Sequence, residues 1–204
     1  MRCKQALCAT LFLMASGVAA ANTADISWNY VSAGYAKASI KTDADRLKPD
    51  GWQLQGSFLL NEYLYVRARH DRVTDIWQDV SIKAEQSWLS LGLRRPSLPG
   101  VDAFFEAGYA SAKTSTGVVF VDDVAFRIND SSNGYQLAAG FRYQATPALE
   151  LGIALRHVDL SGQDRSNLGE LSGRYRLNHQ IDLYSDYVFD SDDSIWGLGI
   201  SVRF

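Results

Sequence analysis

The sequence predicts an all-β protein, a transmembrane antiparallel up-and-down β-barrel of ten strands. Three observations support this prediction. Apolar and polar residues alternate through ten segments, the chain begins with the pattern of an export signal, and the polar faces carry many charges. A water-soluble β-sandwich could not bury those charges in its core. A membrane barrel satisfies all three, because one face of each strand meets lipid and the other lines the interior.

The first 21 residues have the pattern of a secretory signal peptide. Arg2 and Lys4 precede an apolar run that ends at Met14, and small residues lead to Ala21, after which we expect cleavage. The run is shorter than the roughly 20 apolar residues of a membrane-spanning helix. Residues 22–204 are therefore expected to form one outer-membrane β-barrel domain. Both cysteines lie inside the signal, so we expect no disulfide and no thiolate site in the mature domain.

Each expected strand is a run of alternating apolar residues bounded by turn residues. An even number of strands is typical of bacterial outer-membrane barrels and places both chain ends at the periplasmic side. Eight strands is the alternative, if the first hairpin or the weakly patterned segment 80–94 is misread. The ten segments are, in order, 26–40, 51–60, 63–71, 80–94, 101–112, 134–145, 148–158, 170–177, 181–190 and 194–204.

Short turns and longer loops are expected to alternate between these strands. The parity of the apolar residues changes within 80–94, which predicts either a β-bulge near Gln86 and Ser87 or a strand that rises above the membrane. The expected periplasmic turns are 61–62, 96–100, 146–147 and 178–180, and the expected outer loops are 41–50, 71–80, 112–133, 158–170 and 189–194.

The apolar faces of the strands are expected to meet lipid. Those that contain Trp52, Phe105, Leu137 and Ile153 carry no charge, and an Arg or Lys at mid-bilayer would cost about 2–4 kcal/mol. Aromatic residues gather at the strand ends, which predicts two interfacial girdles. The outer girdle would contain Trp52, Tyr109, Tyr135, Tyr187, Phe189 and Trp196, and the inner girdle Trp28, Tyr30, Tyr63, Tyr143 and Phe204.

The opposite faces predict a polar ladder inside the barrel. A three-residue turn at 178–180 would set Arg176 opposite Asp182, and the same construction around residue 98 sets Arg94 opposite Asp102. Mixed charges indicate a filled interior, although inward glycines leave a narrow path for ions or small solutes open. The predicted ladder consists of Arg67, Arg69, Arg94, Asp102, Glu106, Arg142, Glu150, Arg174, Arg176, Asp182 and Asp186.

The sequence offers little support for catalysis, metal binding or nucleic-acid binding. His157, Asp159 and Ser161 have the residue types of a catalytic triad, but a triad is defined by geometry, so an ordinary solvated histidine is favoured. We expect no catalytic residue and no cofactor. The acidic outer loops contain no calcium-loop spacing, so no metal site is assigned. No basic nucleic-acid-binding face is present in the sequence.

The chain resembles the small porin-like or opacity-like outer-membrane β-barrel proteins of Gram-negative bacteria, in particular a xanthomonad-type subgroup. Four short motifs carry the resemblance: Ser27-Trp28-Asn29-Tyr30-Val31 followed by Gly34-Tyr35, Asp50-Gly51-Trp52, Ala107-Gly108-Tyr109, and Gly-Leu-Gly-Ile-Ser-Val-Arg-Phe at 197–204. The resemblance implies a location in the cell outer membrane, with outer-membrane lipid and lipopolysaccharide as neighbours. It implies no catalytic residues.

The C-terminal segment also resembles the signal read by the barrel-assembly machinery, which implies that this machinery and periplasmic chaperones are transient partners. The residues concerned are Trp196, Leu198, Ile200, Val202 and Phe204. The favoured function is a non-enzymatic, monomeric outer-membrane protein with a structural or surface-interaction role through its loops. The alternatives are a narrow porin-like channel for ions or small solutes and an outer-membrane lipid-modifying enzyme.

Overall fold

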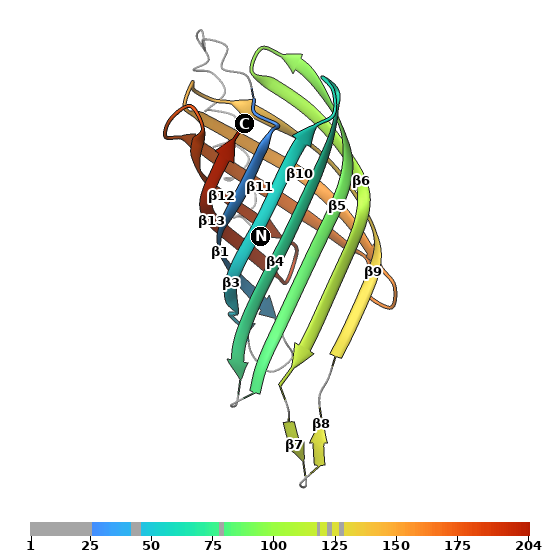
Figure 1. Ribbon diagram of the computed structural model, residues 1–204. Helices are drawn as coiled ribbons and strands as arrows, with labels where there is room; N and C mark the ends of the chain where they lie inside the picture. Colours follow the sequence, from blue (N-terminus) through green and yellow to red (C-terminus); the bar gives the residue numbers. More distant parts are fainter. Residues whose placement is uncertain (1–25, 42–45, 78–79, 118, 122–123, 127–128) are drawn as a thin grey trace, which may run out of the picture.

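Ten long strands form one closed antiparallel barrel (Figure 1). The computed structural model describes residues 26–41, 46–77, 80–117, 119–121, 124–126 and 129–204. The barrel strands are β1 (Tyr30–Lys41), β3 (Asp50–Leu59), β4 (Leu64–Trp77), β5 (Val80–Leu98), β6 (Val101–Thr116), β9 (Asn129–Gln144), β10 (Leu149–Leu160), β11 (Ser166–Arg176), β12 (Ile181–Phe189) and β13 (Ser194–Arg203). The short strands are β2 (Arg46–Leu47), β7 (Val119–Val121) and β8 (Val124–Phe126).

The barrel closes because its first and last strands pair. Tyr30 lies opposite Arg203, and the pairing continues to Ser39 and Ser194. Every other barrel strand pairs with its neighbours in the sequence. The predicted fold class and the count of ten strands are confirmed, and the alternative of eight is wrong. Within the described residues, no helix is both long and apolar enough to cross a membrane.

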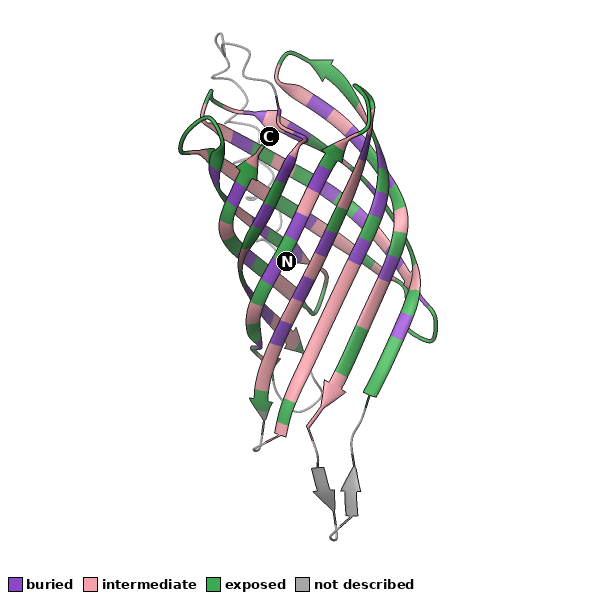
Figure 2. Ribbon diagram, viewed as in Figure 1, coloured by how far each residue is buried: buried purple, intermediate pink, exposed green. Residues whose placement is uncertain are grey.

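Buried and exposed residues alternate along the barrel strands (Figure 2). The alternation follows from strand geometry, because successive side chains point to opposite faces of a sheet. Large apolar residues lie on the outside, as predicted, where a soluble protein would not expose so many. They include Trp52, Leu54, Phe58, Phe105, Tyr109, Tyr135, Leu137, Phe141, Leu151, Ile153 and Leu155.

The two ends of the barrel differ. The connections 60–63, 99–100, 145–148 and 177–180 are short and lie at the same end as the C-terminus, which we call the turn end. The opposite end, the loop end, has the connections 42–49, 78–79, 117–128, 161–165 and 190–193. Outer-membrane barrels place short turns in the periplasm and longer loops outside. The loop end is therefore the outer one.

Four strands continue past their neighbours at the loop end. The predicted outer loop 71–80 is wrong, because β4 and β5 remain paired as far as Trp77 and Val80. The predicted loop 112–133 is shortened in the same way, since β6 ends at Thr116 and β9 begins at Asn129. Beyond them β7 pairs with β8, and Figure 1 places this hairpin past the end of the barrel.

The predicted bulge near Gln86 and Ser87 is wrong, and the alternative of a rising strand is the observed one. The pairing of β4 with β5 has no register shift at these residues. Strand β5 has 19 residues, whereas about 9–11 span a membrane. The apparent change of parity has a simple cause: Ile82 and Ala84 face the interior like Trp88, but at a level where the interior is apolar.

Candidate functional site

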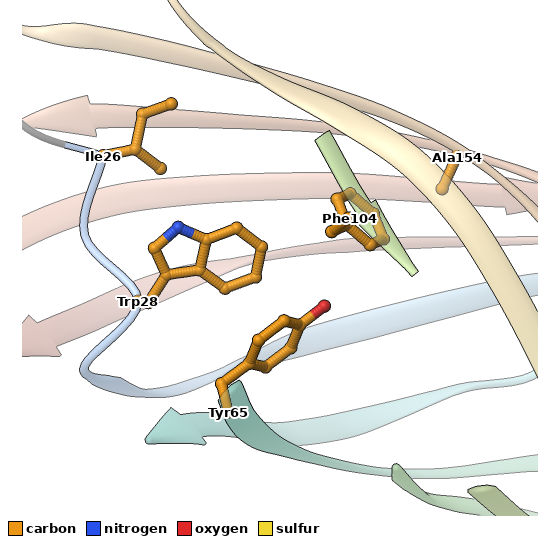
Figure 3. Packing of buried hydrophobic residues seen from close by; sticks show 5 residues of the cluster. All are labelled: Ile26, Trp28, Tyr65, Phe104 and Ala154. Carbon is orange, nitrogen blue, oxygen red and sulfur yellow. The ribbon is translucent and has the colours of Figure 1, made fainter. Parts of the chain in front are cut away.

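An aromatic cluster closes the turn end of the barrel, and we call it the turn-end plug. It consists of Ile26, Trp28, Tyr65, Phe104 and Ala154. Figure 3 shows that Ile26 and Trp28 come from the chain before β1 and lie beside side chains from β4 and β6. The ring centroids of Trp28 and Tyr65 lie 4.3 Å apart, and those of Trp28 and Phe104 lie 5.9 Å apart. Tilted and edge-on rings at such distances attract each other.

Polar groups hold the plug in place. The indole Nε1 of Trp28 donates a hydrogen bond to Asp102 Oδ2 over 2.7 Å. The guanidinium of Arg142 lies 4.2 Å from the ring centroid of Trp28, and its Nε donates to Glu150 over 2.8 Å. Trp28 and Tyr30 are buried. Their predicted place in the inner aromatic girdle is therefore wrong, because these rings fill the barrel instead of facing lipid.

The middle of the barrel holds a group of charged side chains that we call the central network. Its core is Arg156, which is 1% exposed. Arg156 Nη2 lies 3.1 Å from Glu106 Oε2 and 2.9 Å from Glu170 Oε2. Arg67 reaches the same two carboxylates, at 3.4 Å and 2.6 Å. Arg156 also donates to the side-chain oxygen of Gln136. Two arginines and two glutamates thus neutralise one another across the interior.

The central network continues toward the loop end. Arg69 Nε donates to Asp71 Oδ2 over 2.7 Å, and its Nη1 donates to Asp186. Gln53 Nε2 also donates to Asp186, over 2.8 Å. These four side chains are buried. A buried charge is tolerated when it is paired and hydrogen-bonded, so the network members depend on one another.

Inward glycines make room for these side chains. A Cβ at Gly197 would lie 1.9 Å from Gln53 Oε1 and 2.2 Å from Asp186 Oδ1, and a Cβ at Gly199 would lie 2.8 Å from Tyr184 Cε1. The space that these glycines leave is therefore occupied by neighbouring side chains. A cavity at this level, lined in part by network residues, has a volume of about 30 Å³, room for about two water molecules.

On the last strands the register of the predicted ladder is correct, but the ion pairs differ from those predicted. Arg176 lies opposite Asp182, as predicted. Asp182 Oδ2, however, lies 2.9 Å from Arg203 Nε on β13, and Arg174 Nη1 donates to Ser201 Oγ over 2.8 Å. Long arginine side chains reach across to the next strand, so direct opposition does not decide the partner.

The predicted opposition of Arg94 and Asp102 is wrong. Arg94 lies opposite Phe104, because β5 continues to Leu98, the turn contains only two residues, and the register shifts by one residue between Leu98 and Pro96. Gly100 in that turn has a positive φ of 73°, which glycine adopts without strain. Arg94 Nη1 still lies 3.3 Å from Asp102 Oδ2 along a diagonal. The charges meet although the register differs.

Three charged members of the central network, Asp71, Arg156 and Glu170, lie outside the predicted ladder. Glu170 falls within the predicted outer loop 158–170, and the structure instead places it, buried, on β11. Arg156 is an inward residue on β10 whose partners could not be identified from local spacing, because Glu106 and Glu170 come from other strands. A signal for Glu170 does exist in the sequence: it shares the parity of Arg174 and Arg176.

Between the central network and the loop end, the interior becomes apolar. Ala36, Ala38 and Val73 form one buried cluster, and a second contains Trp88 and Val158. They border a cavity of about 260 Å³ at the loop end, which we call the outer cavity. Its apolar lining residues are Ala38, Ile40, Val73, Ala84, Ala112, Val158, Leu160, Leu168, Val188, Phe189 and Ile195.

The histidines do not assemble a catalytic triad. His157 Nδ1 lies 2.8 Å from Asn167 Oδ1. Asp159 Oδ2 instead accepts a hydrogen bond from Arg165 Nε over 2.9 Å. The candidate trio of His157, Asp159 and Ser161 is thus not connected by the hydrogen bonds that a nucleophile and its base require.

A different histidine contacts a serine. His70 Nδ1 lies 2.8 Å from Ser87 Oγ, across β4 and β5. The ring of His70 packs against Trp52, with centroids 5.1 Å apart. The sequence pattern alone does not bring these residues together, because their contact depends on the register of two strands. In the described part of the chain, no group of three His, Cys, Asp or Glu side chains is placed to hold a metal ion.

Comparison with known proteins identifies a family. A model of the outer membrane protein beta-barrel domain matches residues 8–204. No curated protein sequence matches the chain. Similar solved structures include Ail, the attachment invasion locus protein of Yersinia pestis, in complex with the heparin analogue sucrose octasulfate, at 15% identity and a TM-score of 0.49, covering 86% of this chain and 97% of that one.

Two further solved structures are similar to the chain. Neisserial surface protein A is 16% identical with a TM-score of 0.46, and 87% of this chain and 98% of that one are covered. The outer membrane protein OprG of Pseudomonas aeruginosa is 13% identical with a TM-score of 0.43, and 87% of this chain and 97% of that one are covered.

Proposed function

The chain belongs to the outer membrane protein beta-barrel family and lies in the outer membrane, and we propose that it is a non-enzymatic surface protein that acts through its loop end. The observation that carries this proposal is the filled interior. The turn-end plug and the central network occupy two successive levels of the barrel, and the charges of the network are paired. Transport along the axis would require these ion pairs to break, and breaking a buried pair costs several kcal/mol.

The loop end offers a surface for interaction. Strands β4, β5, β6 and β9 continue past the ends of β3 and β10, and we call the extended part the raised wall, residues 75–77, 80–87, 111–116 and 129–133. Its segments 111–116 and 129–133 are rich in Ser, Thr and Asn. These side chains offer hydrogen-bond donors and acceptors to a polar partner. The wall stands on a rigid barrel, which favours a stable binding surface.

A truncated wall tests the surface-interaction role. Ala112 and Ser132 lie directly opposite each other, so residues 113–131 can be replaced by Asn-Gly, a favoured two-residue hairpin turn. Cells that display the intact or the truncated protein are compared for adhesion to glycans, matrix proteins and abiotic surfaces. We expect truncation to abolish adhesion, and replacement of 161–165 by a Gly-Ser segment of equal length to preserve it. Equal adhesion of all three proteins would contradict the proposal.

Conductance distinguishes the porin-like alternative. The protein is inserted into planar lipid bilayers at 1 M salt, and we expect no stable current steps because the interior is filled. Regular ohmic steps that disappear on heat denaturation would instead establish a channel. The lipid-modifying alternative predicts a changed lipid A profile on overexpression, and a His157→Ala variant would then lose that change.

Three further points extend this proposal. We propose that residues 1–21 are removed on export, that the alternating residues from Trp196 to Phe204 are read by the barrel-assembly machinery, and that the protein is monomeric. The membership of a xanthomonad-type subgroup stays a prediction. The N-terminus of the protein purified from outer membranes, determined by sequencing, tests the cleavage site: it should be Asn22.

A further inference from the structure

The outer cavity differs from the central network in having mostly apolar walls. Below it, the interior is crossed by ion pairs, whereas its own walls come from the two clusters that contain Val73, Ala84, Val158 and Ile195. The change occurs along the same strands. On β4, for example, Arg69 and Asp71 belong to the central network, while the next inward residue, Val73, lines the cavity.

Trp88 and the central network lie beneath the outer cavity. The ring of Trp88 is 4% exposed and packs in the same cluster as the lining residue Val158. The guanidinium groups of Arg156 and Arg69 lie 4.4 Å and 5.2 Å from the centroid of this ring. A molecule that enters from the loop end would therefore stop at Trp88 and the central network.

The outer cavity has the size of a small-ligand site. Its volume is about 260 Å³, and an apolar cavity of about 150 Å³ is enough to bind benzene. Small-molecule pockets are usually apolar with a few placed polar groups. Apolar walls of this extent favour an occupant with a hydrocarbon chain or an aromatic ring, because water gains few hydrogen bonds there.

Fixed carboxylates stand at the mouth of the cavity. Asp190 Oδ1 accepts hydrogen bonds from the backbone N–H groups of Asp192 and Asp193, over 2.9 Å and 2.7 Å. Asp193 Oδ1 accepts one from the backbone N–H of Lys41, over 2.9 Å. Both Asp190 and Asp193 line the cavity. The carboxylates are thus oriented by the backbone, with further lone pairs available to a ligand.

The remaining charged residues around the cavity do not reverse the negative charge of its mouth. Asp71 lines the floor side and is paired with Arg69. Glu85 also lines the cavity and lies 3.4 Å from Arg72. The lining includes a single lysine, Lys113, whose side chain is exposed and follows the inward Ala112 in the strand alternation. A cation therefore complements the mouth better than an anion does.

We propose that the outer cavity binds a small hydrophobic cation of the alkylammonium or arylammonium class. The apolar part of the ligand lies against the walls between Val73 and Ile195, and the ammonium group lies beside Asp190 and Asp193. This inference is independent of adhesion by the raised wall.

The test uses the protein purified from outer membranes and placed in nanodiscs of zwitterionic lipid. N-phenyl-1-naphthylamine, a neutral apolar fluorophore, reports occupancy, and empty nanodiscs provide the background. The dye is then displaced by decylammonium or by decanoate, two ligands of equal chain length and opposite charge. We expect saturable dye binding above background. Decylammonium should displace the dye at about fivefold lower concentration than decanoate, as expected for an exposed ion pair worth up to about 1 kcal/mol.

Matched variants locate the site. Ala112→Phe places a ring in the cavity and should abolish the saturable signal, whereas Ala107→Phe makes the same change on the lipid-facing side of β6 and should preserve it. Ala84→Phe is a second blocking variant if the first fails to fold, as judged by heat-dependent mobility in SDS gels. Asp190→Asn combined with Asp193→Asn should remove the preference for decylammonium.

Four results would overturn the proposal. The first is a dye signal no larger than that of empty nanodiscs, and the second is an unchanged signal in a folded blocking variant. The third is equal displacement by decylammonium and decanoate, which would leave an apolar cavity without selection by charge. The fourth is a preference for decylammonium that persists in the double Asn variant, because the carboxylates would then not be its cause.

Discussion

Replacing Arg156 by methionine should destabilise the barrel strongly. The arginine is 1% exposed and lies within 3.1 Å of Glu106 and 2.9 Å of Glu170. Methionine has a similar length but no charge, so the two carboxylates would share Arg67 as their nearest cation. One buried negative charge is then uncompensated. Breaking a buried ion pair in this way costs about 3–5 kcal/mol, and we expect the free energy of unfolding to fall by that amount.

A double variant tests the physical reason. Adding Glu106→Gln to Arg156→Met removes the excess charge and leaves the pair of Arg67 and Glu170, whose atoms lie 2.6 Å apart. The double variant should therefore be more stable than the sum of the single changes implies, by about 1–3 kcal/mol, as is usual for residues in one network. The exposed Arg95 provides the control, because Arg95→Met should change stability by less than about 0.5 kcal/mol.

Reversible urea unfolding in lipid vesicles, followed by tryptophan fluorescence, provides the measurement. Gel mobility before and after heating reports the folded fraction independently. The reasoning would be refuted if Arg156→Met lowered the free energy of unfolding by less than 1 kcal/mol. It would also fail if the costs of the two single changes simply added, because the central network would then not act as a unit.

Two other substitutions and one deletion test separate features. Gly92→Ala places a Cβ 2.2 Å from Cζ of the buried Tyr65 ring and should lower the free energy of unfolding by about 1–3 kcal/mol, whereas Gly173→Ala, whose nearest atom would be 3.8 Å away, should leave the urea midpoint nearly unchanged. Ile200→Arg puts a charge on the lipid face and should lower the free energy of unfolding by about 2–4 kcal/mol in the same assay. The same change at an interior position should not give this loss. Deletion of Phe204 should reduce the amount of protein in the outer membrane without preventing refolding in detergent; equal amounts in cells would contradict its role in assembly.

The strands and their outer faces could be predicted from the sequence because both depend on local order. Alternation with a period of two identifies strands and sorts side chains by face. A short turn then fixes the pairing of adjacent strands, as it does for Arg176 and Asp182. Where the turn was placed one or two residues too early, as before Gly100, the register was wrong, although the strands were correct.

The interior contacts could not be predicted because they join strands that are distant in the sequence. Arg67 on β4 meets Glu170 on β11, and the indole of Trp28 meets Asp102 on β6. Such contacts depend on the curvature and closure of the barrel. Trp28 illustrates the difficulty, since an aromatic residue at a strand end fits an interfacial girdle and a plug equally well.

The height of the raised wall was also beyond the reach of the sequence pattern. Outward-facing positions beyond the membrane need not be apolar. The alternation of apolar and polar residues therefore fades where β4 and β5 leave the bilayer. Polar residues such as Thr114 and Ser131 in the predicted loop 112–133 therefore indicated a loop, although they belong to paired strands. The false change of parity in β5 arose at the same level, where the inward Ala84 lies in an apolar part of the interior.

The pairing of β1 with β13 has a consequence for the order of folding. Ser32 and Ser201 are hydrogen-bonded over 2.8 Å and are separated by 169 positions. The entropy lost in joining such distant segments must be met before the contact stabilises anything. Hairpins between sequential strands can form early, but closure must wait for the last strand, and folds with such high contact order form slowly. The seam is therefore the expected rate-limiting step, and until it closes both edge strands expose unpaired backbone groups that can recruit another chain.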